Sequence, residues 1–583
     1  MKRRNFIKTT VATSAFLTSN SVFGIYNMSQ LDLSNEAPID PIIPIRIFPD
    51  HEQENISQII KLREQYGFRR FMYLGPSKTV RFSGFPNRDV YLKIGEKILE
   101  LNNILSPYDI EMGWECSATI KQGPGAPYQF VTGIDGRISD ISFCPLDTDF
   151  MEVLSNNIST VVSIAKPFMV IMEDDYTARH AGYGCFCPLH LAEFSDRQNK
   201  NYSREDLLKL FSTVTPESIR LRRAWAELMC DSLTNLAGLI RQKVDTIAPD
   251  TRILLCQPGS ADIEGDMTES VTKAFAGNTK PAVRLYGTDY GSDSAERLPE
   301  IIFHVLYNAQ RLPENFELYH ESDQFPHTRF FMSASKIKSL MTAAFAYGLD
   351  DSRFHPVQNT DNYLEEKGYV NMYSNEINRF NALKAAVKNC RVEGCEIMYD
   401  PFEHIIDAYG AKGTRRYAWA NVTGRLGIPH TSKNGKVKMV SGNVVDLMSD
   451  DEISKLLSGS VFLDGKAAYK LCKKGYKDLI GADVLPGVEP KFLYEGVRDD
   501  AGISDIEGSI MYNLLIFVVA TEGGSYVMLK PAKSAKILTD FLDADENPVT
   551  PGMMRFENKL GGRVAITAFD LNNNSSSAVI NYK

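Results

Sequence analysis

Between residues 42 and 356, short apolar segments typical of β-strands alternate with amphipathic segments typical of helices, and this alternation constrains the fold most. The apolar segments are IPIRIF at 43–48, RRFMYL at 69–74, DIEMGW at 109–114, FMVIME at 168–173, RILLCQ at 252–257, AVRLYG at 282–287, ENFELYHE at 314–321 and a weak one near Ala346. Eight such units predict a (β/α)8 TIM barrel, an α/β fold. A doubly wound open sheet is the alternative, but no G-x-G-x-x-G follows the first strand, so dinucleotide binding has no support.

The 583-residue chain is too long for a single core, and its pattern changes after about Cys390. We expect the barrel to span residues 40–388. Strands and helices alternate again over 389–488, which predicts a small flavodoxin-like α/β domain. Over 489–583, strands separated by Gly- and Asn-rich turns predict a C-terminal β-sheet domain.

The first 24 residues have the layout of a bacterial export signal. Arg3 and Arg4 precede a modest apolar run that ends near Phe23, and the string RRNFIK resembles a twin-arginine signal. This pattern predicts a periplasmic or extracellular protein that is exported already folded. No later stretch reaches the ~20 apolar residues of a membrane span, so none is expected.

Net charge and cysteine usage argue against a nucleic-acid-binding protein and against a protein built on a disulfide framework. The formal net charge is -9, whereas dedicated nucleic-acid binders usually carry a basic face, so no nucleic-acid partner is expected. The nine cysteines form an odd and scattered set, which is not the pattern of a disulfide framework.

Three consecutive acids, Glu173, Asp174 and Asp175, follow the fourth apolar segment. Active sites of barrels lie at the carboxyl ends of the strands. Strand alternation would place Glu173 and Asp175 on one face, and mutual repulsion would raise the pKa of one of the three carboxyls, as a general acid requires. The alternative is an acidic helix start with a capping aspartate.

A metal-ligand pattern, Cys185-Phe-Cys187-Pro-Leu-His190, begins ten residues after Asp175. The C-x-C-x2-H spacing suits tetrahedral zinc but supplies only three ligands, so Cys144 or Cys116 would have to provide the fourth. The alternatives are buried free thiols or a Cys185–Cys187 bridge.

The order of strand, acid pair, tyrosine, glycine, C-x-C-x2 ligand and apolar helix resembles the family 42 glycoside hydrolases, mostly β-galactosidases. The resemblance implies a catalytic barrel, an α/β trimerisation domain and a small β domain, and hence a homotrimer. It also implies that Asp175 is the general acid/base and that Asp174 stands where the family has a substrate-binding Asn. The family has Asn-Glu where this chain has two aspartates. The family's structural zinc would be held here by Cys144, Cys185, Cys187 and His190.

A glycosidase needs a second carboxyl. The resembled family has a glutamate nucleophile at the end of the seventh strand, where this chain has Glu321, with Asp323 as the alternative. Nearby His320, His327 and Arg329 are expected to lower the pKa of Glu321. The alternative is a polar loop with a helix cap.

Other residues are expected at the same end of the barrel. Trp114 and Tyr286 are candidates for stacking on a sugar, and Arg46 is expected to point inward and to need a carboxylate partner. Glu173 is a further substrate-binding candidate. Weaker candidates at this end are Asp289, Asp351, Arg353 and His355.

The sequence as a whole predicts an exported, retaining glycoside hydrolase that acts on an oligosaccharide or glycoside and contains structural zinc. One alternative is a non-catalytic carbohydrate-binding or scaffold protein on the same fold. The other is a metal-dependent hydrolase that uses the three consecutive acids at 173–175.

Overall fold

The computed structural model describes residues 37–76, 84–180, 184–288, 298–325, 327, 331–357, 362–409, 417–487, 492–502, 505–511 and 526–571. The expected export signal at 1–24, the candidate Asp289 and the cationic Arg329 lie outside the described residues. The apolar run NLLIFVVATEGG and the segment AVINYK lie outside them as well.

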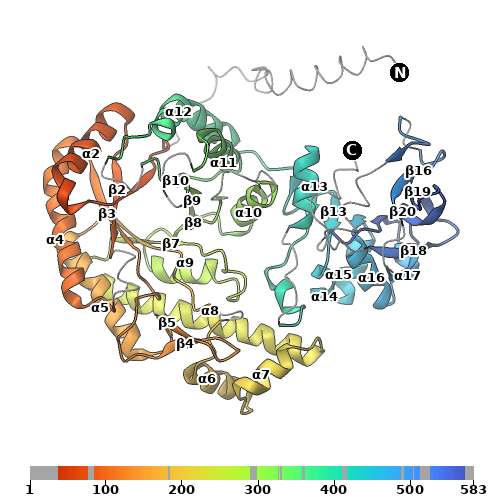
Figure 1. The fold of residues 1–583 in the computed structure, drawn as a ribbon, viewed down its shortest axis with the longest axis horizontal. Helices are drawn as coiled ribbons and strands as arrows, with labels where there is room; N and C mark the ends of the chain where they lie inside the picture. Colours follow the sequence, from red (N-terminus) through yellow and green to blue (C-terminus); the bar gives the residue numbers. More distant parts are fainter. Residues whose placement is uncertain are drawn as a thin grey trace.

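Eight parallel strands close into a barrel, as the sequence predicts (Figure 1). Closure follows from β1, which pairs with β2 on one side and β10 on the other. Around the barrel the order is β1-β10-β9-β8-β7-β6-β3-β2. The strands are β1 (Ile42–Ile45), β2 (Arg70–Gly75), β3 (Glu111–Cys116), β6 (Met169–Met172), β7 (Arg252–Cys256), β8 (Ala282–Leu285), β9 (Glu317–Ser322) and β10 (Asp351–Phe354).

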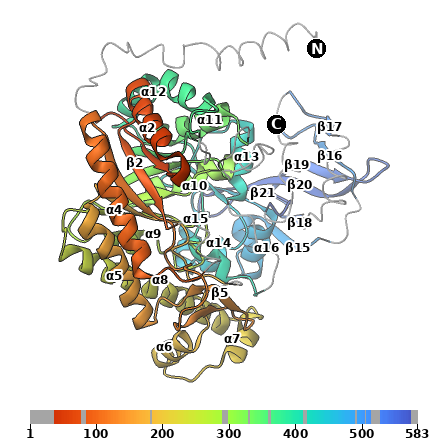
Figure 2. The same ribbon diagram turned by 60° about the vertical axis from the view of Figure 1, so that its left-hand side comes forward.

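Helices surround the barrel, and it is extended at one side by the helices within residues 188–211 and the antiparallel strand pair within 130–143 (Figures 1 and 2). Local caps mark several helix starts: the Asp147 side chain accepts from two backbone N–H groups of α5, and Thr215 and Ser218 form a capping box at α8. No helix in the described part of the chain is long and apolar enough to cross a bilayer. The elements are α2 (Glu52–Tyr66), α4 (Arg88–Leu105), α5 (Thr148–Ala165), α6 (Pro188–Gln198), α7 (Arg204–Phe211), α8 (Pro216–Asp245), α9 (Thr268–Ala276), α10 (Leu298–Arg311), α11 (Ala334–Ala346), α12 (Gly368–Val387), β4 (Phe130–Thr132) and β5 (Ile138–Phe143).

The position expected for the eighth strand is wrong. Ala346 is the last residue of α11, and the strand β10 begins five residues later at Asp351. Its sequence, DSRF, is polar because Asp351 and Arg353 point into the barrel and find ion-pair partners there. A search for apolar runs therefore passes over this strand.

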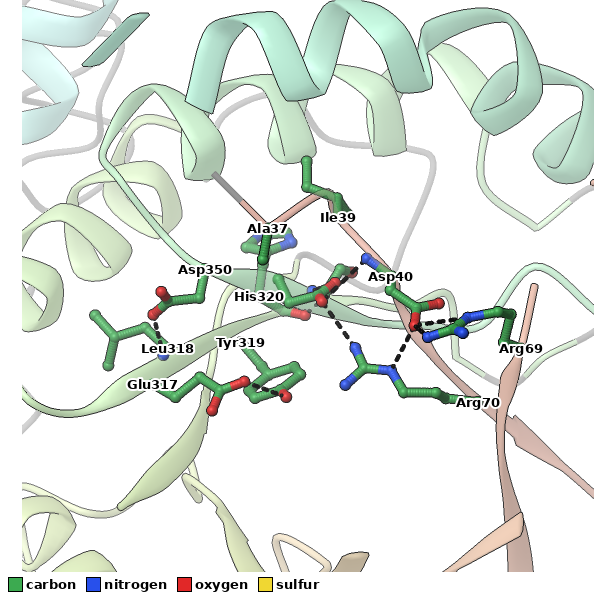
Figure 3. Close-up of polar contacts among 12 residues, drawn as sticks. Ala37, Ile39, Asp40, Arg69, Arg70, Glu317, Leu318, Tyr319, His320 and Asp350 are labelled. Atoms are coloured by element: carbon green, nitrogen blue, oxygen red, sulfur yellow. Dashed lines mark hydrogen bonds and ion pairs between the residues drawn. The ribbon is translucent and has the colours of Figure 1, made fainter. Parts of the chain in front are cut away.

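The barrel interior is built in layers. The bottom layer is charged: Arg70 pairs with Asp351 at 2.8 Å and with Asp40 at 3.4 Å, and Figure 3 shows Asp40 lying between Arg69 and Arg70. Asp351 therefore lies at the amino ends of the strands, so its expected place in the active-site mouth is wrong. The middle layer is apolar and is formed by Ile42, Met72, Met169, Ile171, Leu254, Cys256, Ala282 and Tyr319.

The rest of the chain forms a second layered region with one continuous nine-stranded sheet, in the order β12-β11-β13-β14-β21-β20-β19-β16-β17. The first five strands are mutually parallel and the others antiparallel. The boundary expected at 488/489 therefore does not separate two sheets. The strands are β11 (Cys395–Ile397), β12 (His430–Thr431), β13 (Val437–Val440), β14 (Ser460–Leu463), β16 (Tyr494–Val497), β17 (Ile510–Met511), β19 (Lys536–Leu542), β20 (Pro548–Glu557) and β21 (Arg563–Thr567).

Helices and a separate strand pair pack on this sheet, and its core includes Phe303 and Leu306 from α10 of the barrel. The two regions therefore share a hydrophobic cluster. The helices are α13 (Ala418–Leu426), α14 (Val444–Leu447), α15 (Asp450–Leu457), α16 (Gly465–Lys473) and α17 (Lys477–Ile480), and the pair is β15 (Ala482–Pro486) with β18 (Val527–Pro531).

The bottom layer makes a stability prediction. Arg70→Met should lower the free energy of unfolding by about 3–5 kcal/mol, because it leaves Asp351 buried without its cation. Adding Asp351→Leu should recover much of this loss. The control is Arg69→Met, whose side chain is 43% exposed and should cost no more than about 1 kcal/mol. Urea unfolding of the full chain measures all three, and equal losses at Arg69 and Arg70 would contradict the burial argument.

Candidate functional site

The acid run at 173–175 lies at the carboxyl end of β6, where the chain leaves the barrel. The strand ends at Met172 and the backbone turns at Asp174 and Asp175, so strand alternation does not apply to these acids. Glu173 is buried, and so is Asp175, which is 2% exposed. The Asp175 carboxylate accepts hydrogen bonds from the hydroxyl and backbone N–H of Thr119. The side chain of Asp174 is 39% exposed.

The segment after Asp175 is held by a buried carboxylate from the neighbouring loop. Glu264 accepts hydrogen bonds from the Thr177 hydroxyl at 2.6 Å and the Ala178 N–H at 2.7 Å. Burial raises the pKa of Glu264, although these bonds oppose the change. The turn that carries Asp174 and Asp175 is thereby held at Asp175 by Thr119 and just after it by Glu264.

Arg284 on β8 joins the acid run to Glu321. One terminal nitrogen of its guanidinium lies 2.7 Å from Glu321 Oε1, and the other lies 3.6 Å from Asp174 Oδ2. Glu321 is on β9, 1% exposed, and also accepts from the Gly287 N–H at 3.3 Å. Two carboxylates from different strand ends therefore meet at one cation, at the end of the barrel where active sites lie.

The expectation that cations lower the pKa of Glu321 is wrong. Burial raises the pKa of Glu321 to about 7 and outweighs the opposing effect of Arg284. His320 does not act on the carboxylate, because its ring bonds to the Ser322 hydroxyl and the Gly287 carbonyl. Burial lowers the pKa of His320 to about 4, so that ring is neutral near pH 7.

A second arginine, Arg353 of β10, organises the other side of the same layer. It binds both carboxylate oxygens of Glu115 on β3, at 2.6 and 3.2 Å, and Asp323 at 2.6 Å. Asp323 also contacts His327 Nε2 at 2.7 Å. Burial works to raise the pKa of Asp323, but His327 and Arg353 outweigh it and hold this pKa well below its usual range.

Three of the residues expected to bind sugar are Trp114, Tyr286 and Arg46. The structure buries Trp114 and places the other two near the barrel mouth. Trp114 is fully buried, donates to the Gly75 carbonyl at 2.9 Å and packs edge-on against Tyr91 of α4, so its predicted role in stacking is wrong. Tyr286 is half-buried just after β8, next to His304. Arg46 is half-buried just after β1, and its carbonyl accepts from Tyr363.

Sequence reasoning missed three charged or polar members of this layer: Glu115, Arg284 and Thr119. Arg284 is the only charged residue of the segment AVRLYG, and a lone charge within an otherwise apolar barrel strand was an available signal. Glu115 gave no such signal, because the same strand also contains Glu111. Thr119 lies in an irregular loop and had none.

The metal-ligand residues converge as the sequence predicts. Cys144, Cys185, Cys187 and His190 are all buried, with their ligand atoms within 4.8 Å of one another. Cys144 Sγ lies 3.4 Å from Cys187 Sγ and 3.2 Å from His190 Nδ1. Cys116, the other candidate for fourth ligand, instead contacts the Ala118 carbonyl.

The donor set of this cluster fits a tetrahedral cation. Edges of 3.2 to 3.6 Å match bonds of roughly 2.0–2.3 Å from nitrogen and sulfur to one central ion. His190 Nε2 contacts the Ser232 hydroxyl at 3.3 Å, a support that orients ligating histidines. Burial raises the pKa of the Cys144 thiol, and a cation bound in the cluster would oppose this by stabilising the thiolate. The cluster can therefore hold a metal ion.

Comparison with known structures gives the same fold. No family model and no curated sequence matches the chain. The β-galactosidase from Rahnella sp. R3 aligns with a TM-score of 0.61 and 12% identity over 94% of this chain and 88% of that one. The GH42 β-galactosidase Gan42B aligns with 0.58 and 11%, over 94% and 87%. The exo-β-1,4-mannosidase Op5Man5 from Opitutaceae bacterium strain TAV5 aligns with 0.52 and 10%, over 93% and 94%. The chain has the fold of these glycoside hydrolases, which is the fold that the resemblance to family 42 implies.

The Cys3His cluster predicts a stability loss on ligand removal. Cys187→Ser should lower the melting temperature and remove about one metal ion per chain, because a three-ligand site binds far more weakly. The matched control is Cys256→Ser, a buried thiol inside the barrel that belongs to no metal-ligand group among the described residues. Metal analysis and thermal unfolding measure both effects. If Cys187→Ser retains the metal and the stability, the cluster is not a metal site.

Proposed function

We propose that the protein is a glycoside hydrolase whose reaction centre is the charged layer at the carboxyl ends of the barrel strands. The observation that carries the proposal is the pairing of Glu321 and Asp174 on one guanidinium, that of Arg284. Glycosidases hydrolyse their substrates with two carboxyl groups across the scissile bond. The fold shared with β-galactosidases supports this assignment.

Glu321 is proposed as the nucleophile of a retaining mechanism, and the second carboxyl comes from the pair Asp174–Asp175. The family resemblance assigns the acid/base role to Asp175. The contacts favour Asp174, because Asp175 is 2% exposed and bonded to Thr119, whereas Asp174 faces Arg284 and solvent. Arg284 then positions both carboxylates and stabilises the ionised nucleophile.

The substrate proposed first is a β-D-galactoside, since solved structures with this fold are β-galactosidases. A β-mannoside is next, from the exo-β-1,4-mannosidase. Tyr286 offers a half-buried ring at the mouth for one face of the sugar.

The non-catalytic carbohydrate-binding alternative has one observation in its favour. The residue at the family's acid/base position, Asp175, is an aspartate held away from solvent by Thr119. A panel of aryl glycosides separates the two proposals, because a binding protein retains affinity for a sugar but shows no turnover.

Substitution of the carboxylates should reveal their roles. Glu321→Gln should lower kcat by roughly 10³-fold or more, because no covalent intermediate forms. Asp174→Asn should lower the rate of hydrolysis of a glycoside with a poor leaving group by roughly 10²–10⁴-fold. It should spare a dinitrophenyl glycoside, because dinitrophenolate departs without being protonated. Asp175→Asn is the matched control. If Asp175→Asn shows this leaving-group dependence and Asp174→Asn does not, the acid/base is Asp175.

The remaining features are also proposals. Zinc would be structural in the Cys3His cluster, because four protein ligands leave no open position for water. The twin-arginine-like segment would direct export of the folded, zinc-loaded protein to the periplasm or beyond.

The second region is proposed to join three copies of the chain, as the family resemblance implies. Light scattering at micromolar concentration should then give about three times the 65.3 kDa of one chain. A mass equal to one chain would remove the trimer.

A further inference from the structure

We propose that Asp323, His327 and His355 form a second metal site, for zinc or a similar divalent cation, beside Glu321 at the barrel mouth. One ligand atom of each of the three lies within 4.8 Å of those of the other two. Two imidazoles and one carboxylate are a donor set that binds first-row divalent metals and leaves coordination positions open. This site shares no residue with the Cys3His cluster.

The contacts of His355 leave one ring nitrogen available as a ligand. Its Nδ1 lies 2.8 Å from the Val357 carbonyl and donates to it, so Nε2 of the neutral ring carries the lone pair. Nε2 is buried and has no hydrogen-bond partner in the described part of the chain. A backbone carbonyl that binds the other ring nitrogen is the support that ligating histidines usually have.

Asp323 and His327 supply the other two ligands. Asp323 Oδ1 accepts from His327 Nε2 at 2.7 Å, while its second oxygen is held by Arg353 at 2.6 Å. A metal ion would replace the proton between Asp323 and His327, and Arg353 would continue to orient the carboxylate. His327 has a left-handed backbone, with φ at 63°, which non-glycine residues adopt at a cost and often at functional sites.

Metal binding requires the His327 ring to turn. The rings of His327 and His355 stack with centroids 3.9 Å apart and planes at 12°, so one ion cannot lie in both ring planes. His327 is the less buried of the two, so its ring is the one that would rotate, giving up its stacking on His355. The ligand atoms then close to the roughly 3.3 Å separation of a tetrahedral zinc site.

The surrounding charge favours a dication. Four carboxylates of this layer face two guanidinium groups, which leaves a formal charge of −2 (4 negative, 2 positive) when all are ionised. A divalent ion would offset this negative charge. The six groups are those of Glu115, Asp174, Glu321, Asp323, Arg284 and Arg353.

Equilibrium dialysis of the full chain against buffered zinc, followed by metal analysis, tests the site. The expected content of the wild-type chain is about two zinc ions. It should fall to about one ion in His355→Asn and in His327→Asn, because the Cys3His cluster keeps its zinc. The matched control is His430→Asn. Among the described residues, His430 also bonds a backbone carbonyl and has a buried Nε2 without a hydrogen-bond partner, but it belongs to no metal-ligand group. This variant should keep both ions.

Cobalt(II) provides a second measurement that does not depend on the stability of a variant. Titration of the wild-type chain should give two spectra in turn, an intense thiolate-to-cobalt band from the Cys3His cluster and a weaker band set from a nitrogen and oxygen site. If His327→Asn loses only the weaker bands, those of cobalt at the nitrogen and oxygen site, the result supports the proposal. A single zinc ion in the wild-type chain, or two ions retained in both His327→Asn and His355→Asn, would overturn it.

Discussion

The ion pairs that Arg353 makes across the barrel determine the arrangement of the candidate site. Its guanidinium joins Glu115 of β3 to Asp323 beyond β9, and all three groups are buried. Removing such charges from water costs several kcal/mol each, and only close, well-oriented partners offset this cost. The upper layer of the barrel is therefore a set of mutually dependent charges, in which Arg284 holds the buried Glu321 at 2.7 Å and lies 3.6 Å from the partly exposed Asp174.

The sequence predicted the barrel because seven strands are apolar runs between amphipathic helices, and it missed the place of the eighth because DSRF is polar. The Cys3His ligands were predictable. Cys185, Cys187 and His190 are close in sequence, and Cys144 lies just before α5, the helix that leads into β6. The orientation of Asp175 was not, because it depends on Thr119, which lies 56 residues away. Arg284 and Glu115 acquire their roles only when distant strands close into a ring, which local patterns do not describe.

Two kinds of pairing connect the barrel to the second region. An apolar one places Phe303 and Leu306 of α10 in the core of the nine-stranded sheet. A polar one runs from Tyr417 through His304 to Gln257, which accepts from the backbone of Tyr286 at the barrel mouth. Three side chains therefore form a continuous hydrogen-bonded path from the second region to the mouth.

The strand β21, residues 563–567, lies in the middle of the nine-stranded sheet, between β14 and β20. Its parallel partner β14 comes about a hundred residues earlier in the chain, so the sheet must wait for β21 before its two halves join. During synthesis the barrel can complete its hydrogen bonds while the ribosome is still translating the second region. That region, by contrast, becomes a single cooperative unit only after β21 has emerged as well.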